Sequence, residues 1–187
     1  GCRNTSLIKK KIVSLKKISI TGPESTGKSD LSTGLARHYN TTCVEEYARD
    51  YINGLDRPYQ QDDLLAIARG QVKREEEKKK TAYRFLFCDT DLLVIKIWSL
   101  HKYGVCNTWI LEELDKNRYD LYLLCDIDLP WQYDPQREHP HLRRFFFDWY
   151  KKELEEYGFP FFIVSGKGQQ RLQNALNSIE SYFGKEI

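Results

Sequence analysis

The sequence predicts an α/β fold, in which helices cover both faces of a five-stranded parallel sheet. Short apolar runs alternate along the chain with longer segments whose apolar residues recur at helical spacing. Several of the short runs are apolar at consecutive positions, as from Phe85 to Cys88, which is typical of parallel strands buried on both faces. Such alternation is typical of folds in which a helix joins successive parallel strands. We expect the 187 residues to form a single domain.

The strands are expected where apolar runs are shortest and are followed by polar or acidic residues. The predicted strands are residues 18–21, 42–45, 84–89, 119–126 and 160–165. The predicted helices are residues 28–39, 61–80, 92–103, 109–117, 145–157 and 169–183. In the second helix, the run REEEKKK places each acid three or four residues before a lysine, which is typical of a solvated helix face. Residues 1–16 are expected to form an N-terminal extension.

Charge and cysteine content exclude several classes of function. The 29 basic and 27 acidic residues nearly cancel, so the chain offers no strong field to nucleic acid or to an anionic membrane. Lysines interrupt the N-terminal apolar segment, which therefore predicts neither a signal peptide nor a membrane span. The five cysteines include no CxxC pair, which favours reduced thiols and a cytoplasmic protein. We expect a small-molecule partner, with no nucleic-acid and no membrane partner.

The most specific motif is GPESTGKS at residues 22–29, which matches GxxxxGK[ST]. A predicted strand precedes it and a predicted helix follows it, as a phosphate-binding loop requires and a surface turn does not. The loop predicts an ATP site made by Gly22, Pro23, Glu24, Ser25, Thr26, Gly27, Lys28 and Ser29, with Asp30 following. Lys28 is expected to reach the β and γ phosphates, and the Ser29 hydroxyl to bind Mg²⁺.

Two acids accompany this loop, Glu24 within it and Asp30 just after it. Backbone N–H groups, rather than side chains, make the cradle for phosphate, so neither acid is excluded from the motif. Asp30 falls in the first helical turn, where the helix dipole favours an acid. Glu24 is expected to face the pocket for the acceptor or to pair with Arg49.

Acids at two strand ends are candidates for catalysis. Asp89 ends the strand FLFCD and is the expected second Mg²⁺ ligand. Asp91 is expected either to cap the following helix or to contact substrate, and the residues do not decide between these roles. Glu46, in the run CVEEYARDY, is suited to orient an attacking hydroxyl and accept its proton, or to bind ribose hydroxyls. The alternative is a Glu46–Arg49 ion pair within a helix.

Residues 130–144 are the expected lid-like segment, with three prolines and several basic side chains. Arg137 is expected to neutralise charge as a phosphoryl group moves. Arg143 and Arg144 are expected to share this role or to start an exposed helix. The spacing of the lid histidines favours loop residues over metal ligands.

The motifs GPESTGKS, EEYARDYI, IARGQ, FCDTDLLVIKIW, YDLYLLCDIDLPW and DPQREHP resemble, in this order, the ribosylnicotinamide kinase domain of NadR proteins and its stand-alone relatives. The resemblance runs over residues 17–179. It implies a P-loop NTPase fold of the nucleotide-kinase type with a lid segment. It also implies transfer of the γ-phosphate of ATP to the 5′-hydroxyl of nicotinamide riboside, which gives nicotinamide mononucleotide for NAD biosynthesis.

The resemblance also implies roles for individual residues. Residues 22–29 correspond to the ATP phosphate loop, Glu46 and Arg49 to the substrate-side motif, Asp89 and Asp91 to the strand-end acids, and Arg137 to the lid arginine. We expect Lys28, Glu46, Asp89 and Arg137 to be catalytic, and Asp91 is a candidate for substrate binding. Tyr47, Trp98 or Trp109 is expected to stack on the flat pyridinium cation, with Trp98 the first choice, although aromatic residues are more often part of a core. Full-length NadR has an adenylyltransferase domain before the kinase, and little sequence precedes this loop, so we expect neither NAD synthesis nor gene repression. Asp30 departs from the Ser or Thr that often follows the motif.

Two alternative functions remain open on the sequence. One is a kinase for another nucleoside or nucleotide, since related folds share the phosphate apparatus. The other is a P-loop ATPase that acts as a regulatory switch, which the lid-like basic segment disfavours because it is suited to shielding a transferred group from water. The sequence leaves the oligomeric state undetermined.

Overall fold

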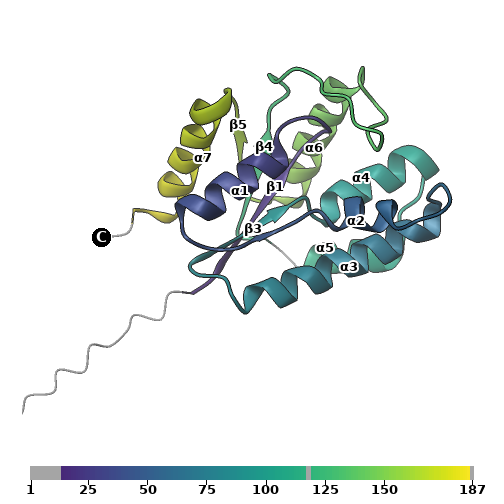
Figure 1. The fold of residues 1–187 in the computed structure, drawn as a ribbon, viewed down its shortest axis with the longest axis horizontal. Coiled ribbons are helices and arrows are strands. Elements are labelled where there is room, and N and C mark those ends of the chain that lie inside the picture. The colour runs from purple at the N-terminus through teal and green to yellow at the C-terminus, as the bar shows by residue number, and fades with distance from the viewer. Residues whose placement is uncertain (1–13, 117–118, 186–187) are drawn as a thin grey trace, which may run out of the picture.

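The structure, a computed structural model, describes residues 14–116 and 119–185 (Figure 1). Most of the expected N-terminal extension, including Cys2, lies outside the described residues, and the first strand already begins at Lys16. The sequence-predicted end of a helix at Asn117 also lies outside them. None of the described helices combines the length and the apolarity needed to cross a bilayer.

A five-stranded sheet forms the centre of the fold, and all its pairings are parallel. Its strands are β1 (Lys16–Thr21), β2 (Cys43–Val44), β3 (Phe85–Asp89), β4 (Leu121–Cys125) and β5 (Phe161–Val164), in the spatial order β2-β3-β1-β4-β5. The predicted fold class is confirmed, and each predicted strand overlaps one of these. Strands β3 (FLFCD) and β4 (LYLLC) are runs of apolar residues because helices cover the sheet on both sides, whereas β1 (KKISIT) mixes polar and apolar residues.

The helices are α1 (Lys28–His38), α2 (Tyr47–Asn53), α3 (Gln61–Lys79), α4 (Leu92–Tyr103), α5 (Thr108–Lys116), α6 (Arg143–Tyr157) and α7 (Gly168–Phe183). The short α2 was not among the predicted elements. Tyr47, Ala48, Tyr51 and Ile52 pack against the core at helical spacing, but seven residues are too few for the spacing to repeat and indicate a helix. The start of α6 lies at Arg143, within the segment expected to be a lid.

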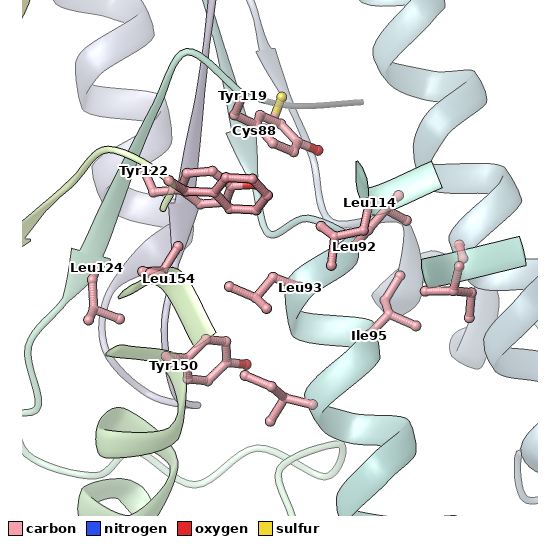
Figure 2. Close-up of a cluster of buried hydrophobic side chains, with 14 of the residues drawn as sticks. Cys88, Leu92, Leu93, Ile95, Leu114, Tyr119, Tyr122, Leu124, Tyr150 and Leu154 are labelled. Carbon is pink, nitrogen blue, oxygen red and sulfur yellow. The ribbon is translucent and has the colours of Figure 1, made fainter. Parts of the chain in front are cut away.

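The two faces of the sheet have separate cores. Helices α1 and α7 cover one face, where Leu35 and Ile179 pack on strand residues such as Ile20. Helices α2 to α6 lie on the other face (Figure 1). Figure 2 shows part of this second core, where Leu93 of α4 and Leu154 of α6 belong to one buried cluster with residues of β4.

Helix α2 is held against α3 at a glycine. The aromatic ring of Tyr47 occupies the place of a missing side chain at Gly70, where an added Cβ would lie 2.0 Å from the ring atom Cε1. The guanidinium of Arg74, one turn further along α3, lies 4.8 Å from the centre of the same ring. The contact between Tyr47 and Gly70 fixes the start of α2. It therefore also fixes the position of the residues that α2 brings to the carboxyl edge of the sheet.

The strand ends that matter for function meet at one edge of the sheet. Parallel strands all end on the same side, and in open α/β sheets ligands bind there. The loop after β1, Asp89 at the end of β3, and the long connection from β4 to α6 therefore lie at a common edge.

Candidate active site

The loop between β1 and α1 has the backbone that a phosphate cradle requires. Gly22 has φ 133°, and an added Cβ would lie 3.1 Å from the carbonyl oxygen of Cys125 in β4. Gly27 has φ 74° and precedes the first residue of α1, so the loop turns directly into a helix N-terminus. Backbone N–H groups of such a turn are free to bind an anion.

Lys28 extends across this loop. Its Nζ donates a hydrogen bond of 2.6 Å to the carbonyl oxygen of Pro23. Thr26 Oγ1 donates to the same oxygen over 2.8 Å and braces the loop from within. The ammonium group therefore lies at the mouth of the cradle, where it would meet the phosphates of a nucleotide.

Ser29 and Asp89 are brought together as a hydroxyl and a carboxylate. Ser29 Oγ donates to Asp89 Oδ2 over 2.5 Å. Among the described residues, the buried Oδ1 of Asp89 has no hydrogen-bond partner. Burial raises the pKa of Asp89, while the Ser29 hydroxyl and the Lys28 ammonium oppose the shift. One hydroxyl and one unsatisfied carboxylate oxygen suit Mg²⁺, which keeps several of its waters when bound, so these residues fit the ion expected from the sequence.

Asp91 performs the first of the two roles left open for it. It is the N-cap of α4 and accepts a hydrogen bond from the backbone N–H of Val94, and Thr21 Oγ1 donates to it over 3.3 Å. The residue is fully buried, and burial raises its pKa to about 7. The expected substrate contact was therefore wrong, because the side chain is enclosed beneath the helix that it caps.

A cavity of about 430 Å³ opens at the carboxyl edge of the sheet. The phosphate loop and Asp30 of α1 line it together with residues of α2, α4, α6 and the segment 130–142. Its apolar lining includes Val94, Ile97, Trp98, Phe146 and Tyr150. A site for phosphates and a largely apolar wall thus share one cavity.

Glu46, the residue that precedes α2, lines this cavity. Burial and the nearby charge of Asp89 raise the pKa of its carboxyl group, and Lys28 and Arg49 oppose the shift. A carboxylate whose pKa is raised toward neutrality is a more effective proton acceptor. Arg49 also lines the cavity, but its guanidinium pairs with Asp134 over 2.9 Å.

The three aromatic candidates have different environments. Trp98 lines the cavity, and its indole N–H donates to the hydroxyl of Tyr59 over 2.9 Å. Tyr47 is seated on Gly70 and is not among the residues that line the cavity, although its neighbours Glu46 and Ala48 are, so substrate binding by Tyr47 stays a prediction. Trp109 packs under the guanidinium of Arg69 and is likewise not a lining residue.

Residues 130–142, called the lid below, form most of the connection from β4 to α6 and contain no helix or strand. Arg137 lines the cavity, and its guanidinium donates to the carbonyl oxygen of Gln132 over 2.6 Å. Arg143, the first residue of α6, donates to the carbonyl oxygen of Ser25 in the phosphate loop. Arg144 is exposed and lies 3.8 Å from Asp148, as expected of an exposed helix start.

Glu24 also lines the cavity, and its carboxylate binds the lid. Its two oxygens accept hydrogen bonds from the backbone N–H groups of Glu138 and His139. Facing the cavity agrees with the first expectation for this residue. The alternative, a pair with Arg49, is not formed, because Arg49 pairs with the lid through Asp134.

Arg171 of α7 supports the phosphate loop and was missed by the sequence reasoning. Its buried guanidinium donates to the carbonyl oxygen of Thr26 over 2.8 Å and to that of Asp126 over 2.8 Å. It also pairs with Asp128 over 2.8 Å. The available signal was its spacing, since Arg171 falls on the same helical stripe as Ala175 and Ile179, where an apolar residue is expected.

Comparison with known proteins relates this chain to one protein family and to NadR proteins. A family model described as an AAA domain matches residues 17–171. The trifunctional NAD biosynthesis/regulator proteins NadR of Salmonella typhimurium and Escherichia coli are each 32% identical over 127 residues, which cover 66% of this chain and 31% of theirs. The chain thus spans about a third of the length of these relatives.

Several solved structures are similar to this chain, including those of NadR proteins. A NadR protein in complex with nicotinamide riboside (NR) superposes with a TM-score of 0.72 at 25% identity, over 92% of this chain and 52% of that one. A NadR protein in complex with NAD and AMP-PNP gives a TM-score of 0.71 at 25% identity, over 92% of this chain and 50% of that one. Deoxyadenosine kinase from M. mycoides, at 16% identity and a TM-score of 0.63 over 88% of this chain and 99% of that one, shares the fold.

Proposed function

The chain belongs to the AAA domain family and is homologous to NadR proteins, and from this premise we propose that it is an ATP- and Mg²⁺-dependent kinase of nicotinamide riboside. The reaction would transfer the γ-phosphoryl group of ATP to the 5′-hydroxyl and give nicotinamide mononucleotide, a step in NAD biosynthesis. The observation that carries this proposal is the single cavity that combines the phosphate loop, the Glu46 carboxylate and the Trp98 wall.

The nucleotide half of the cavity supplies binding and charge. The N–H groups of the loop would hold the phosphates, and Lys28 would contact the β and γ phosphates. Mg²⁺, held by Ser29 and Asp89, would neutralise charge between those phosphates when bound. Arg137 lines the same cavity and would stabilise the charge on the phosphoryl group in transit.

Glu46 is the proposed general base. Its carboxylate would accept the proton of the 5′-hydroxyl as the oxygen attacks the γ-phosphorus and the bond to the bridging oxygen breaks, which releases ADP. The raised pKa of Glu46 supports this role, because it brings the proton affinity of the carboxylate closer to that needed near neutral pH.

The acceptor half of the cavity suits a flat cation. Trp98 offers an indole surface, and cations are attracted to the faces of aromatic rings. The carboxylates of Glu24 and Glu46 line the same cavity and would add to the attraction for a positively charged ring.

We place this activity in the cytoplasm and give it a small-molecule partner. The four cysteines within the described residues are free thiols, of which Cys88 and Cys125 are buried, and this supports a reducing compartment.

The test measures ADP release with Mg-ATP alone, with added nicotinamide riboside, and with a panel of ordinary nucleosides. The proposal expects nicotinamide riboside to raise the rate well above the ATP-only background. No increase with nicotinamide riboside would refute it, and an increase with another nucleoside alone would assign a different acceptor. Lys28→Ala should abolish transfer, whereas Lys73→Ala, which removes an exposed lysine of α3, serves as the matched control.

A further inference from the structure

The lid is an internally bonded turn around Arg137. The backbone N–H of Arg137 donates to the carbonyl oxygen of Asp134 over 3.0 Å, and its guanidinium donates to that of Gln132. The N–H of Gln136 donates to the Asp134 carboxylate over 2.9 Å. Because these bonds make the turn compact, the position of Arg137 at the cavity depends on where the turn is anchored.

The residues that follow Arg137 are anchored by the phosphate loop itself. Each carboxylate oxygen of Glu24 lies 3.2 Å from the backbone nitrogen of Glu138, and Oε2 lies 3.1 Å from that of His139. Hydrogen bonds to a charged acceptor are about twice as strong as neutral ones. We propose that Glu24 is a positioning residue whose carboxylate holds the lid on the phosphate loop and thereby places Arg137 beside the group being transferred.

The anchors elsewhere on the lid are of a different kind. The N–H of Gln132 donates to Ser25 Oγ over 2.8 Å, and Asp134 pairs with the partly exposed Arg49. These bonds hold the part of the lid that precedes Arg137. The Glu138 side chain points to the acceptor wall, where it accepts from Tyr59 over 2.8 Å. Without Glu24, the backbone of residues 138–139 would therefore lose its hydrogen bonds to the phosphate loop. The Glu138 side chain would stay bound to Tyr59 and Lys102, and Arg143 would still join the start of α6 to Ser25.

The geometry also explains an acid in a site for polyanions. Two backbone N–H groups converge on the Glu24 carboxylate, and such converging N–H dipoles offset negative charge. The acid would then not face the phosphates as an uncompensated charge. Two substitutions at Glu24 separate the length of the side chain from its charge. Gln keeps the length and removes the charge, whereas Asp keeps the charge and is one methylene shorter.

The direct test follows hydrogen exchange at the backbone amides of Glu138 and His139 in the substrate-free protein. We expect Glu24→Ala and Glu24→Asp to exchange these two amides about tenfold faster, the factor that corresponds to one such hydrogen bond. Glu24→Gln should show a smaller increase, because its amide oxygen keeps the reach to both N–H groups. Glu156→Ala, which removes an exposed acid of α6, is the matched control and should leave both amides unchanged.

The functional test rests on the proposed function and measures how ATP turnover divides between two outcomes. Transfer yields ADP and phosphorylated acceptor, whereas attack by water yields ADP and inorganic phosphate. A displaced lid admits water and misplaces Arg137, so the phosphate-releasing fraction should rise about tenfold in Glu24→Ala and Glu24→Asp, and less in Glu24→Gln. A role in stability alone would lower both outcomes together and leave their ratio unchanged.

Two results would overturn the inference. One is exchange and partition in Glu24→Ala that match the wild type, which would remove Glu24 as the anchor while leaving the kinase proposal intact. The other is a Glu24→Asp protein in which both amides exchange as slowly as in the wild type, since the reach of the side chain would then not hold them. If the wild type transfers nothing to nicotinamide riboside, the proposed function fails, and the exchange measurement still decides whether Glu24 anchors the lid.

Discussion

Replacing Gly70 by alanine tests the seat that fixes α2. Alanine in a helix is normally about 1 kcal/mol more favourable than glycine. At Gly70, however, the new Cβ would lie 2.0 Å from Tyr47 Cε1 and 2.3 Å from Cζ, whereas carbon atoms pack at about 3.5–4.0 Å. The ring must retreat by roughly 1.5 Å, and overpacking of this kind costs about 1–3 kcal/mol.

The two effects oppose each other, so Gly70→Ala should be destabilising by up to about 2 kcal/mol. In a Tyr47→Ala background the clash is absent, and the same substitution should stabilise by about 1 kcal/mol. Urea unfolding of the four proteins of this double-mutant cycle measures the difference. Gly34→Ala in α1 is the control, because its added Cβ would make an ordinary 3.4 Å contact. If Gly70→Ala stabilises as much as Gly34→Ala does while Tyr47 is present, the reasoning is refuted.

Three further predictions concern acids and a buried arginine. Glu46→Gln should lower kcat by about 10²- to 10⁴-fold with little change in ATP affinity. In the wild type, the apparent pKa of the acidic limb of the kcat/KM profile should lie above the range of an ordinary glutamate, because burial raises the Glu46 pKa. Initial rates across pH check both expectations, and unchanged turnover in Glu46→Gln would remove Glu46 from the base role. The pKa of Asp91 is raised from 3.8 to about 7, so the folded state holds this proton more tightly than the unfolded chain, and its stabilising effect is complete below the unfolded pKa and lost as pH rises through about 7. Wild type should therefore lose up to about 3 kcal/mol between about pH 5 and pH 7 relative to Asp91→Asn, in urea unfolding, and parallel profiles would contradict this. Arg171→Met should weaken ATP binding about tenfold or more in calorimetry, because the Thr26 carbonyl loses its donor; equal affinities would show that Arg171 does not support the loop.

The strands and the phosphate loop were predictable because their signals are local. A strand covered on both faces must be apolar at consecutive positions, and this can be read within five residues. The phosphate loop likewise combines a strand, a glycine motif and a helix within one short segment. None of these sequence signals depends on a contact with residues far away in the chain.

The roles that could not be predicted from the sequence belong to residues whose partners lie far away in the chain. Tyr47 was assigned to the cavity, but its direction is set by the missing side chain at Gly70 on another helix. Asp91 remained undecided because an acid after a strand is equally the residue before a helix, and only its burial shows that it acts as a cap. The spacing of Arg171 marks it as facing inward, but its support of the phosphate loop joins residues far apart in the chain, so no local pattern identifies its partner.

The place of β1 at the centre of the sheet has a consequence for synthesis of the protein. Ile20 pairs with Asp89 on one side and with Leu123 on the other, so β1, which precedes both partners in the chain, must wait for them. At translation rates of about 5–20 residues per second, the second partner emerges roughly 5–20 seconds later. During this interval β1 has at least one open edge, a state that invites aggregation. We therefore expect yield in cells to depend strongly on chaperones that bind the nascent chain before β4 is made.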